Sequence, residues 1–348
     1  MGELTSKGNG TQASGRMSEL MRLLNPISQD LGRVETALMA QAAEFPLGVR
    51  DRVQFVLGGT GKRLRPSLAL LAGGATGGVT DKHIILGVIV ELIHIATLVH
   101  DDILDEAELR HGLTTANARW GNEISVLVGD CLFAHALKLA ATHHPNEVCR
   151  KVSEASNAVC VGEILQTQRR FDLDLSVEQY LDIIRMKTGA LFAVSCELGA
   201  FLNAAPASAV KSLSEFGDNL GVAYQIYDDC VDIFGQEGQA GKSLGTDMKK
   251  GKLTLPLLLL LQHTGDDKRE EVGAMILNAD SGERARLMKL VLSNGVVSES
   301  LATIDRYIGR ARANLIGLPG NAHTAALAGM LDFIGSKSRV LLCEEVAA

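Results

Sequence analysis

The stretch ILGVIVELIHIATLVHDDILDE, residues 85–106, decides the fold, because it is apolar at nearly every position and ends in a cluster of carboxylates. A segment that is hydrophobic on most faces predicts a helix buried inside a larger protein. Residues 84–99 include Glu91 and His94 and fall short of the roughly 20 apolar residues of a membrane span. A second apolar run, residues 253–261, is shorter still and contains Pro256. We therefore expect two core helices here and no membrane anchor.

The carboxylates at the end of the first stretch form a DDxxD motif that occurs twice. The copies are Asp101, Asp102 and Asp105, and, in YQIYDDCVDIFG, Asp228, Asp229 and Asp232. On a helix, residues four apart share a face, so each motif projects its carboxylates together. Such clusters are unfavourable in apolar helices unless cations neutralise them, and Mg²⁺ prefers carboxylate oxygens and bridges to phosphates. The pair predicts two walls of one metal–diphosphate site, although an isolated copy would equally suit a solvated helix face.

Helical periodicity runs through nearly the whole chain. Apolar residues recur at three- and four-residue spacing in PISQDLGRVETALMAQ and VEQYLDIIRMKTGALFAVSCELGAFL, whereas strand-like alternation is nearly absent. Ser176 with Gln179 predicts a capping box, Thr80 can cap the long apolar helix, and Pro66 suits a first helical turn. No linker divides the chain. We expect one all-α domain over residues 18–348, after a polar, disordered tail over residues 1–17.

Composition narrows the class of protein. A formal net charge of −7 gives no support for nucleic-acid binding, and 4% aromatic residues with seven prolines argue against an all-β fold. The six cysteines form no CxxC pair, which indicates neither a zinc site nor a disulfide framework and fits a reducing cytosol. The polar N-terminus lacks the apolar core of a signal peptide. We therefore expect a cytoplasmic protein.

Basic residues that could bind anions accompany both motifs. The loop GTGKRLRP places Lys62 and Arg65 after a glycine-rich turn, where backbone NH groups and forked arginine donors suit an anion. Arg110 follows the first motif by five residues and could close over it. Further lysines lie in RMKTGALF and in GKSLGTDMKKGK: Lys187, Lys242 and Lys252. Solvated basic loops and an exposed helical lysine are the alternative interpretation.

With these pieces in place, the chain resembles the trans-prenyltransferases, the isoprenyl (polyprenyl) diphosphate synthases. The matching motifs are GKRLRP, ELIHIATLVHDDILDE, GEILQ (162–166), KTG, YQIYDDCVD and GKSLGTD with GKLTLP. They occur in the family's order between residues 61 and 256. The resemblance implies an isoprenoid synthase fold, in which ten or more helices surround a central cavity, and a homodimer.

The resemblance also implies a reaction in which an allylic diphosphate ionises and isopentenyl diphosphate attacks the cation. Mg²⁺, as three ions per site with Mn²⁺ as an alternative, would be held by Asp101, Asp105 and Asp228. All six motif aspartates would be catalytic. The remaining implied roles are Lys187, Lys242 and Lys252 on the allylic diphosphate, Lys62, Arg65 and His94 on isopentenyl diphosphate, and Thr188 and Gln225 beside the cation.

One departure from the family pattern follows the first motif. The family usually has two arginines there, and the second helps to bind isopentenyl diphosphate, whereas this chain has Arg110 and His111. A histidine near its reference pKa of about 6.5 is a weaker, pH-dependent anion ligand. The role of His111 is therefore open.

Residues just before the first motif bear on product length. Ala96 and Thr97 are small, and the first motif lacks the two-residue insertion of many short-chain bacterial relatives. Both features favour a long product, of octaprenyl to decaprenyl length, for quinone side chains such as ubiquinone, with transient membrane contact. The alternatives are a shorter geranylgeranyl-type product, a terpene cyclase, and a silent subunit of a heteromeric synthase.

Overall fold

The computed structural model describes residues 19–59, 61–110, 112–143, 145–235, 245–278 and 281–344, and they are mostly helical. The first half contains α2 (Ser28–Ala40), α3 (Leu47–Leu57), α4 (Leu64–Thr76), α5 (Asp81–Leu104), α6 (Ala116–Trp120), α7 (Asn122–His143) and α8 (Asn146–Gln168), with short 3₁₀ turns at Asn25–Ile27 and Gln41–Glu44. The second half contains α9 (Val177–Ile184), a π-helical turn (Arg185–Gly189), α10 (Ala190–Phe201), α11 (Ala207–Phe234), α13 (Thr246–Lys249), α14 (Leu255–His263), α15 (Asp266–Leu277), α16 (Ser281–Ser293), α17 (Val296–Asn314) and α18 (Ala322–Glu344).

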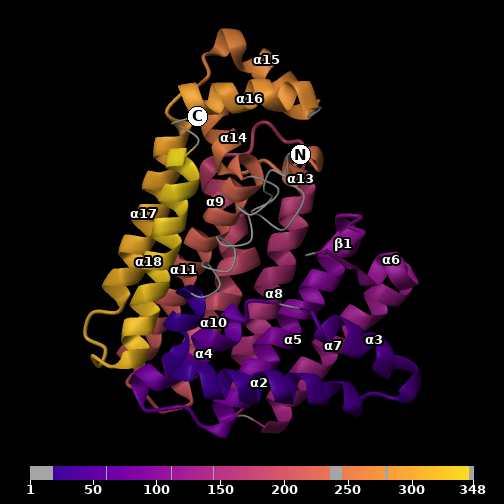
Figure 1. The fold of residues 1–348 in the computed structure, drawn as a ribbon, viewed down its shortest axis with the longest axis vertical. Helices are drawn as coiled ribbons and strands as arrows, with labels where there is room; N and C mark the ends of the chain where they lie inside the picture. Colours follow the sequence, from indigo (N-terminus) through magenta and orange to yellow (C-terminus); the bar gives the residue numbers. More distant parts are fainter. Residues whose placement is uncertain are drawn as a thin grey trace, which may run out of the picture.

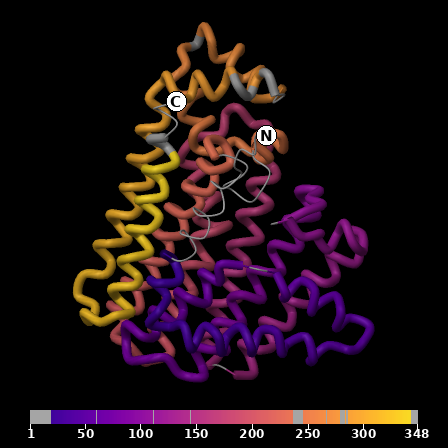
Figure 2. Tube along the Cα trace, viewed as in Figure 1, coloured from indigo at the N-terminus to yellow at the C-terminus, as the bar shows by residue number. Residues whose placement is uncertain are grey.

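The helices are arranged in layers around α5, α10 and α11. Helix α5 packs against α4 and α7, α10 packs against α4 and α11, and α11 also packs against α17. Figure 1 shows α2 running across the lower end, with α17 and α18 along one side and α15 and α16 above. The trace in Figure 2 follows the same path, from the indigo lower layer to the yellow C-terminal helix. This confirms the prediction of an all-α fold.

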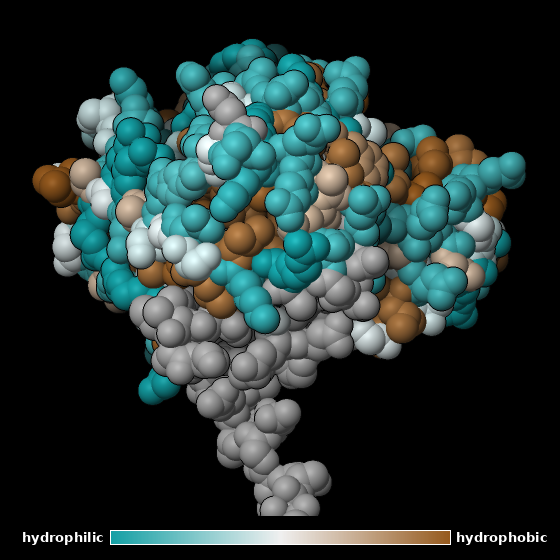
Figure 3. All heavy atoms as spheres, turned by 90° about the horizontal axis from the view of Figure 1, so that it is seen from above, coloured by the Kyte–Doolittle hydropathy of each residue, from teal (hydrophilic) through white to brown (hydrophobic). Residues whose placement is uncertain are grey.

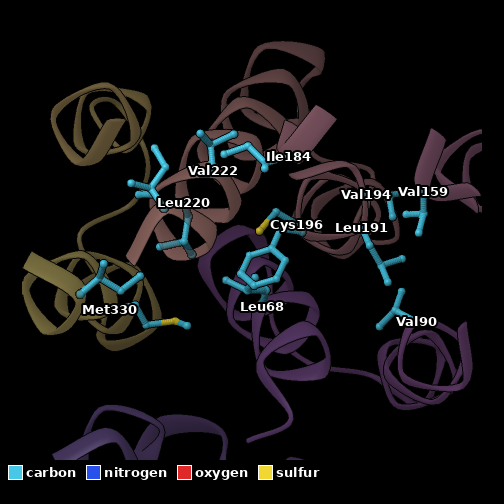
Figure 4. Close-up of a cluster of buried hydrophobic side chains, with 14 of the residues drawn as sticks. Leu68, Val90, Val159, Ile184, Leu191, Val194, Cys196, Leu220, Val222 and Met330 are labelled. Carbon is cyan, nitrogen blue, oxygen red and sulfur yellow. The ribbon is translucent and has the colours of Figure 1, made fainter. Parts of the chain in front are cut away.

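The core lies where α4, α5, α10 and α11 meet (Figure 4). Close approach depends on glycine at two positions. A Cβ on Gly199 would lie 2.4 Å from the carbonyl oxygen of Ala69, and one on Gly217 would lie 2.5 Å from the carbonyl oxygen of Phe192. Any larger residue there would push α10 away from α4 or α11. These contacts fix the spacing of the helices that carry the site.

The two apolar runs are core helices, as predicted. By length and hydropathy alone, α5 and α7 could each span a membrane, as could a bent pair formed by the end of α16 with α17. In α5, however, 72% of the apolar window is buried inside the fold, against 39% in α7. Every residue from 255 to 261 in α14 is buried as well.

Local signals in the sequence were confirmed at several helix ends. The capping boxes at Ser176 and Thr80 both form, and Pro66 lies in the first turn of α4. One element was not predicted: β1 (Leu109–Arg110) pairs antiparallel with β2 (Leu113–Thr114). Strands of two residues are too short to show alternation, so this hairpin has no sequence signal of its own. The predicted tail over residues 1–17 lies outside the described residues.

Candidate functional site

A cavity of about 1440 Å³ lies among α4, α5, α8, α10 and α11. The predicted site residues that line it come from five separate motifs and from Arg110, which follows the first acidic motif: Lys62, Arg65, His94, Thr97, Asp101, Asp102, Asp105, Arg110, Lys187, Thr188, Gln225, Asp228, Asp229 and Lys252. His111 and Lys242 lie outside the described residues. The fold thus brings together groups that are far apart in the sequence.

The first acidic motif lies at the C-terminal end of α5. Asp101 is in the last turn, whereas Asp105 follows the helix as its C-cap with φ −97° and ψ 2°. Burial raises the pKa of Asp101 and outweighs the opposing charge of Lys187. Burial also raises the pKa of Asp102, although the Nε of Arg110 donates a hydrogen bond to its Oδ1 at 2.8 Å. The predicted closure of Arg110 over this motif is therefore observed.

Asp105 differs from its neighbours because basic groups surround it. The Nζ of Lys252 lies 2.9 Å from its Oδ2, the Nζ of Lys250 lies 3.6 Å from Oδ1, and Arg170 approaches Oδ1 to 3.3 Å. Burial opposes ionisation, but these lysines outweigh it and lower the pKa of Asp105. Arg170 and Lys250 were not singled out in the sequence, where neither belongs to a recognised motif position.

The second motif does not repeat the arrangement of the first. Asp228 and Asp229 line the cavity, but Asp232 is fully buried and does not. Its Oδ1 accepts hydrogen bonds from the backbone NH and hydroxyl of Thr246, and its Oδ2 accepts one from the NH of Asp247. The prediction of a directly catalytic Asp232 is therefore corrected: this carboxylate caps the short helix α13, which carries the chain towards Lys252.

Asp229 is buried between two donors. The hydroxyl of Tyr180 donates to its Oδ2 at 2.5 Å, and the Nε2 of Gln225 donates to its Oδ1 at 2.8 Å. Burial, together with the charges of Asp247 and Asp228, raises the pKa of Asp229 to about 7. On its other side, the Oε1 of Gln225 accepts a hydrogen bond from Thr188 at 2.7 Å. Asp229 thus belongs to a hydrogen-bonded chain that ends at the cavity.

Lys187 and Thr188 lie in the π-helical turn between α9 and α10, a feature often found at functional sites. Lys187 is not an exposed helical lysine, because it pairs with Glu163 and donates to the Oε1 of Gln166 at 2.8 Å. Both partners belong to the GEILQ motif, whose role the sequence did not reveal. The pKa of Lys187 is raised because Asp101 and Glu163 outweigh the effect of burial.

At the basic loop, Lys62, Arg63 and Arg65 all line the cavity, but Arg63 has a structural role. Arg63 adopts a left-handed conformation with φ 48° and ψ 39°. Its guanidinium forms hydrogen bonds of 2.9 Å with both oxygens of Glu35 and with Glu91. The guanidinium of Arg65 lies 4.9 Å from the ring centroid of Phe192, and among the described residues its Nε has no hydrogen-bond partner. Arg65 is therefore free to bind an anion.

His94 lies on the same side of the cavity as the basic loop. Burial and the charges of Arg65, Arg110 and Arg63 lower its pKa well below its usual range. The ring is therefore neutral at pH 7 and can donate one hydrogen bond to an anion without adding charge. His94 lines the cavity, as the predicted binding role requires, and that role stays a prediction.

The two residues predicted to set product length lie in different places. Thr97 lines the cavity, and its hydroxyl donates to the carbonyl of His94 at 2.7 Å. Ala96 is fully buried and is not part of the cavity wall. The burial of Ala96 fits close helix packing, so its predicted role in product length stays a prediction, whereas Thr97 faces the space in which a product could grow.

The donors of the site fit a hard cation. Within the described ranges, no group of three or more His, Cys, Asp or Glu side chains is already gathered for a metal ion. Asp101 and Asp228 nevertheless present carboxylates to the cavity from α5 and α11, and Asp105 lines the same cavity, where its Oδ2 pairs with Lys252. Carboxylate oxygens of this kind suit Mg²⁺, which also keeps water and phosphate ligands.

Comparisons with known proteins agree with this geometry. The family described as Polyprenyl synthetase matches residues 49–292. The chain is 36% identical to "Heptaprenyl diphosphate synthase component 2" of Geobacillus stearothermophilus, over 92% of this chain and 99% of the relative. It is 32% identical to "Octaprenyl diphosphate synthase" of Escherichia coli, over 90% of this chain and 97% of the relative.

A solved structure shares the fold. A polyprenyl synthase from Caulobacter crescentus, crystallised with calcium and isoprenyl diphosphate, superposes with a TM-score of 0.85 at 33% identity, covering 91% of this chain and 97% of that one. This shared fold accounts together for the helix layers and for the two acidic motifs and basic loops around one cavity. The chain belongs to the polyprenyl synthetase family, and it is a trans-prenyltransferase.

Proposed function

We propose that this protein condenses an allylic diphosphate with isopentenyl diphosphate, head to tail, to make a long-chain all-trans polyprenyl diphosphate. The observation that carries the proposal is the single cavity of about 1440 Å³, which both acidic motifs and two separate sets of basic residues line. Two sets of cations suit two diphosphate substrates. A terpene cyclase needs only one, so the basic loop favours coupling over cyclisation.

Asp101, Asp105 and Asp228 would hold Mg²⁺, which supplies charge neutralisation at the allylic diphosphate; three ions per site and Mn²⁺ as a substitute are part of the proposal. Lys187 and Lys252 bind the same diphosphate. Charge grows on the leaving pyrophosphate as the allylic bond breaks, and lysines already held in place stabilise it without reorganisation.

On the side of the basic loop, Lys62, Arg65 and neutral His94 bind the diphosphate of isopentenyl diphosphate, and Arg110, which follows the first motif, contributes. The double bond of isopentenyl diphosphate attacks the allylic carbon, and a proton then leaves to the departing pyrophosphate. Thr188 and Gln225 face the cation with oxygen atoms, which stabilise it without forming a bond.

Product length is proposed to be long because the cavity is large, Thr97 is small, and the relatives reported above are named for heptaprenyl and octaprenyl diphosphate synthases. A quinone side chain is the proposed destination, with a cytoplasmic homodimer that contacts membranes briefly to deliver an insoluble product. The exposed apolar residues of α7 and α8 (Val126, Leu127, Val161 and Ile164) support the dimer, because together they offer a surface for a second copy. Seen from above, the described surface is mostly hydrophilic, with hydrophobic patches between (Figure 3).

A direct experiment tests the function. The purified protein is incubated with farnesyl diphosphate, Mg²⁺ and isopentenyl diphosphate, and the products are analysed by mass spectrometry. We expect polyprenyl diphosphates that lengthen in five-carbon steps and that depend on isopentenyl diphosphate.

Three other outcomes would contradict the proposal in different ways. Cyclic hydrocarbons without isopentenyl diphosphate would indicate a cyclase, and a geranylgeranyl product would indicate a short-chain synthase. No turnover by this chain alone, with turnover restored by another protein, would indicate a subunit of a heteromeric enzyme, as the component 2 name of one relative suggests.

A further inference from the structure

We propose that Tyr180, which does not line the cavity, acts through Asp229 to set the orientation of the Gln225 amide, and thereby determines which atoms face the allylic cation. The inference rests on the proposed function and adds a positioning residue to it. Tyr180 belongs to none of the motifs that carry the family resemblance. It lies on α9, while Asp229 and Gln225 lie on α11.

A continuous chain of hydrogen bonds joins these residues. The hydroxyl of Tyr180 donates to the Oδ2 of Asp229 at 2.5 Å, and the Nε2 of Gln225 donates to Oδ1 of the same carboxylate at 2.8 Å. The hydroxyl of Thr188 donates to the Oε1 of Gln225 at 2.7 Å. Tyr180, Asp229 and Thr188 are only 3%, 5% and 5% exposed, so water does not replace these contacts.

The chemistry of the groups gives this chain a direction. The Nε2 of Gln225 donates to Oδ1 of Asp229, so the NH₂ side of the amide faces this carboxyl group. The amide oxygen then faces Thr188, whose hydroxyl has one proton and gives it to that oxygen. The cavity side of the pair is therefore lined by oxygen lone pairs. Oxygen atoms stabilise a carbocation, whereas an amide NH₂ turned towards it would repel it.

Tyr180 holds the carboxylate in the one arrangement that maintains this direction. Its hydroxyl occupies Oδ2, which leaves Oδ1 for Gln225. Without that hydroxyl, a buried carboxylate oxygen loses its partner, and Asp229 can turn and take both amide protons or release the amide. The position of Tyr180 is itself fixed in the first turn of α9, because its NH donates to the carbonyl of Ser176 at 3.0 Å, next to the capping box that Ser176 forms with Gln179.

The test is Tyr180→Phe, which keeps the ring and removes the hydroxyl. We expect kcat to fall about tenfold while KM for both diphosphates stays within twofold, because the lost interaction acts on the cation and not on substrate binding. Tyr307→Phe is the matched control. Tyr307 is an equally buried tyrosine whose hydroxyl accepts a hydrogen bond from Arg185 at 3.5 Å, outside the chain, and its removal should leave kcat within twofold.

A double-mutant cycle separates positioning from a general structural role. If Tyr180 acts through the amide, Tyr180→Phe should have no further effect on kcat once Gln225→Leu has removed the amide. Independent, multiplicative losses would overturn the proposal, as would a Tyr180→Phe enzyme with wild-type kcat.

Two further measurements keep the result interpretable. Circular dichroism and the melting temperature show whether Tyr180→Phe folds; if it does not, Asp229→Asn replaces it, because an asparagine NH₂ in place of one acceptor should turn the Gln225 amide and reduce kcat similarly. Wild-type kcat in Asp229→Asn would also overturn the proposal. A wild-type enzyme with no prenyl transfer would instead contradict the proposed function, so the two failures are distinct.

Discussion

At the scale of single residues, the site depends on which side chains face the cavity and which hold the others in place. Arg63 and Arg65 are two residues apart in one basic loop and both line the cavity, but it is the Nε of Arg65 that has no hydrogen-bond partner among the described residues. Arg63 instead binds Glu35 and Glu91 and stabilises its own left-handed backbone. The sequence predicted an anion site in this loop, but it could not show which arginine faces the anion with a free donor and which one stabilises the loop.

Arg63→Lys should weaken isopentenyl diphosphate binding, although the guanidinium of Arg63 is paired with Glu35 and Glu91 and does not itself bind the substrate. A lysine cannot form the forked contact with Glu35 and reach Glu91 as well, so the loop carrying Lys62 and Arg65 loosens. We expect KM for isopentenyl diphosphate to rise about tenfold, with the KM for the allylic substrate unchanged. Steady-state kinetics measure both values. Arg33→Lys, an exposed pair with Asp30 and Asp81, is the control and should change neither.

Thr97→Phe should change the length of the product, whereas Ala96→Phe should change the stability of the fold. Thr97 lines the cavity, so a phenylalanine there should block growth and shift the products to shorter chains, detected by mass spectrometry. Ala96 is fully buried, so the same change overpacks the core and should lower the free energy of unfolding by about 1–3 kcal/mol. Unchanged products from a folded Thr97→Phe enzyme would show that the chain grows in another direction.

At the scale of elements, α13 links the two acidic motifs. Asp232, from the second motif, caps α13, and the segment that follows returns Lys250 and Lys252 to Asp105 of the first. Because the two motifs lie on different helices, this segment is a structural bridge between them. In its described part, the segment after the second motif therefore begins with a short helix that has an acidic cap.

Asp232→Ala should weaken allylic diphosphate binding. Loss of a cap of this kind reduces stability by about 1 kcal/mol, and Lys252 is then held less firmly. We expect KM for the allylic diphosphate to rise at least fivefold, with KM for isopentenyl diphosphate unchanged. Asp332→Ala, which removes an exposed carboxylate paired with Arg312, is the control. Equal effects on both KM values would argue against a local role.

At the scale of the whole molecule, the fold holds buried carboxylates that a cation would relieve. Asp101 and Asp102 both have pKa values raised by burial. A carboxylate whose pKa is raised on folding is ionised at an energetic disadvantage, so it lowers stability at neutral pH. The packing of helices around α5 and α11 offsets this loss of stability. The buried carboxylates are thereby kept in place for ligand binding.

Asp101→Asn should therefore raise the melting temperature of the protein measured in EDTA while abolishing prenyl transfer. The neutral amide removes the unfavourable buried charge, and it also removes a ligand for Mg²⁺. In the wild type, Mg²⁺ with pyrophosphate should raise the melting temperature by several degrees through mass action, and in the variant this shift should be lost. Differential scanning fluorimetry measures both, and a full shift in Asp101→Asn would exclude this residue as a ligand.

The sequence by itself determined the all-α class, the paired acidic motifs, the basic loop and most of the residues that line the cavity. These follow from local rules, since periodicity, capping and motif spacing act within one helix or loop. Only the tertiary structure decided that Asp232 caps α13, that Arg63 binds Glu35, that Ala96 is core, and that Tyr180 reaches Asp229. Each of these joins residues from different elements, and which side chain faces a neighbour depends on how the helices pack.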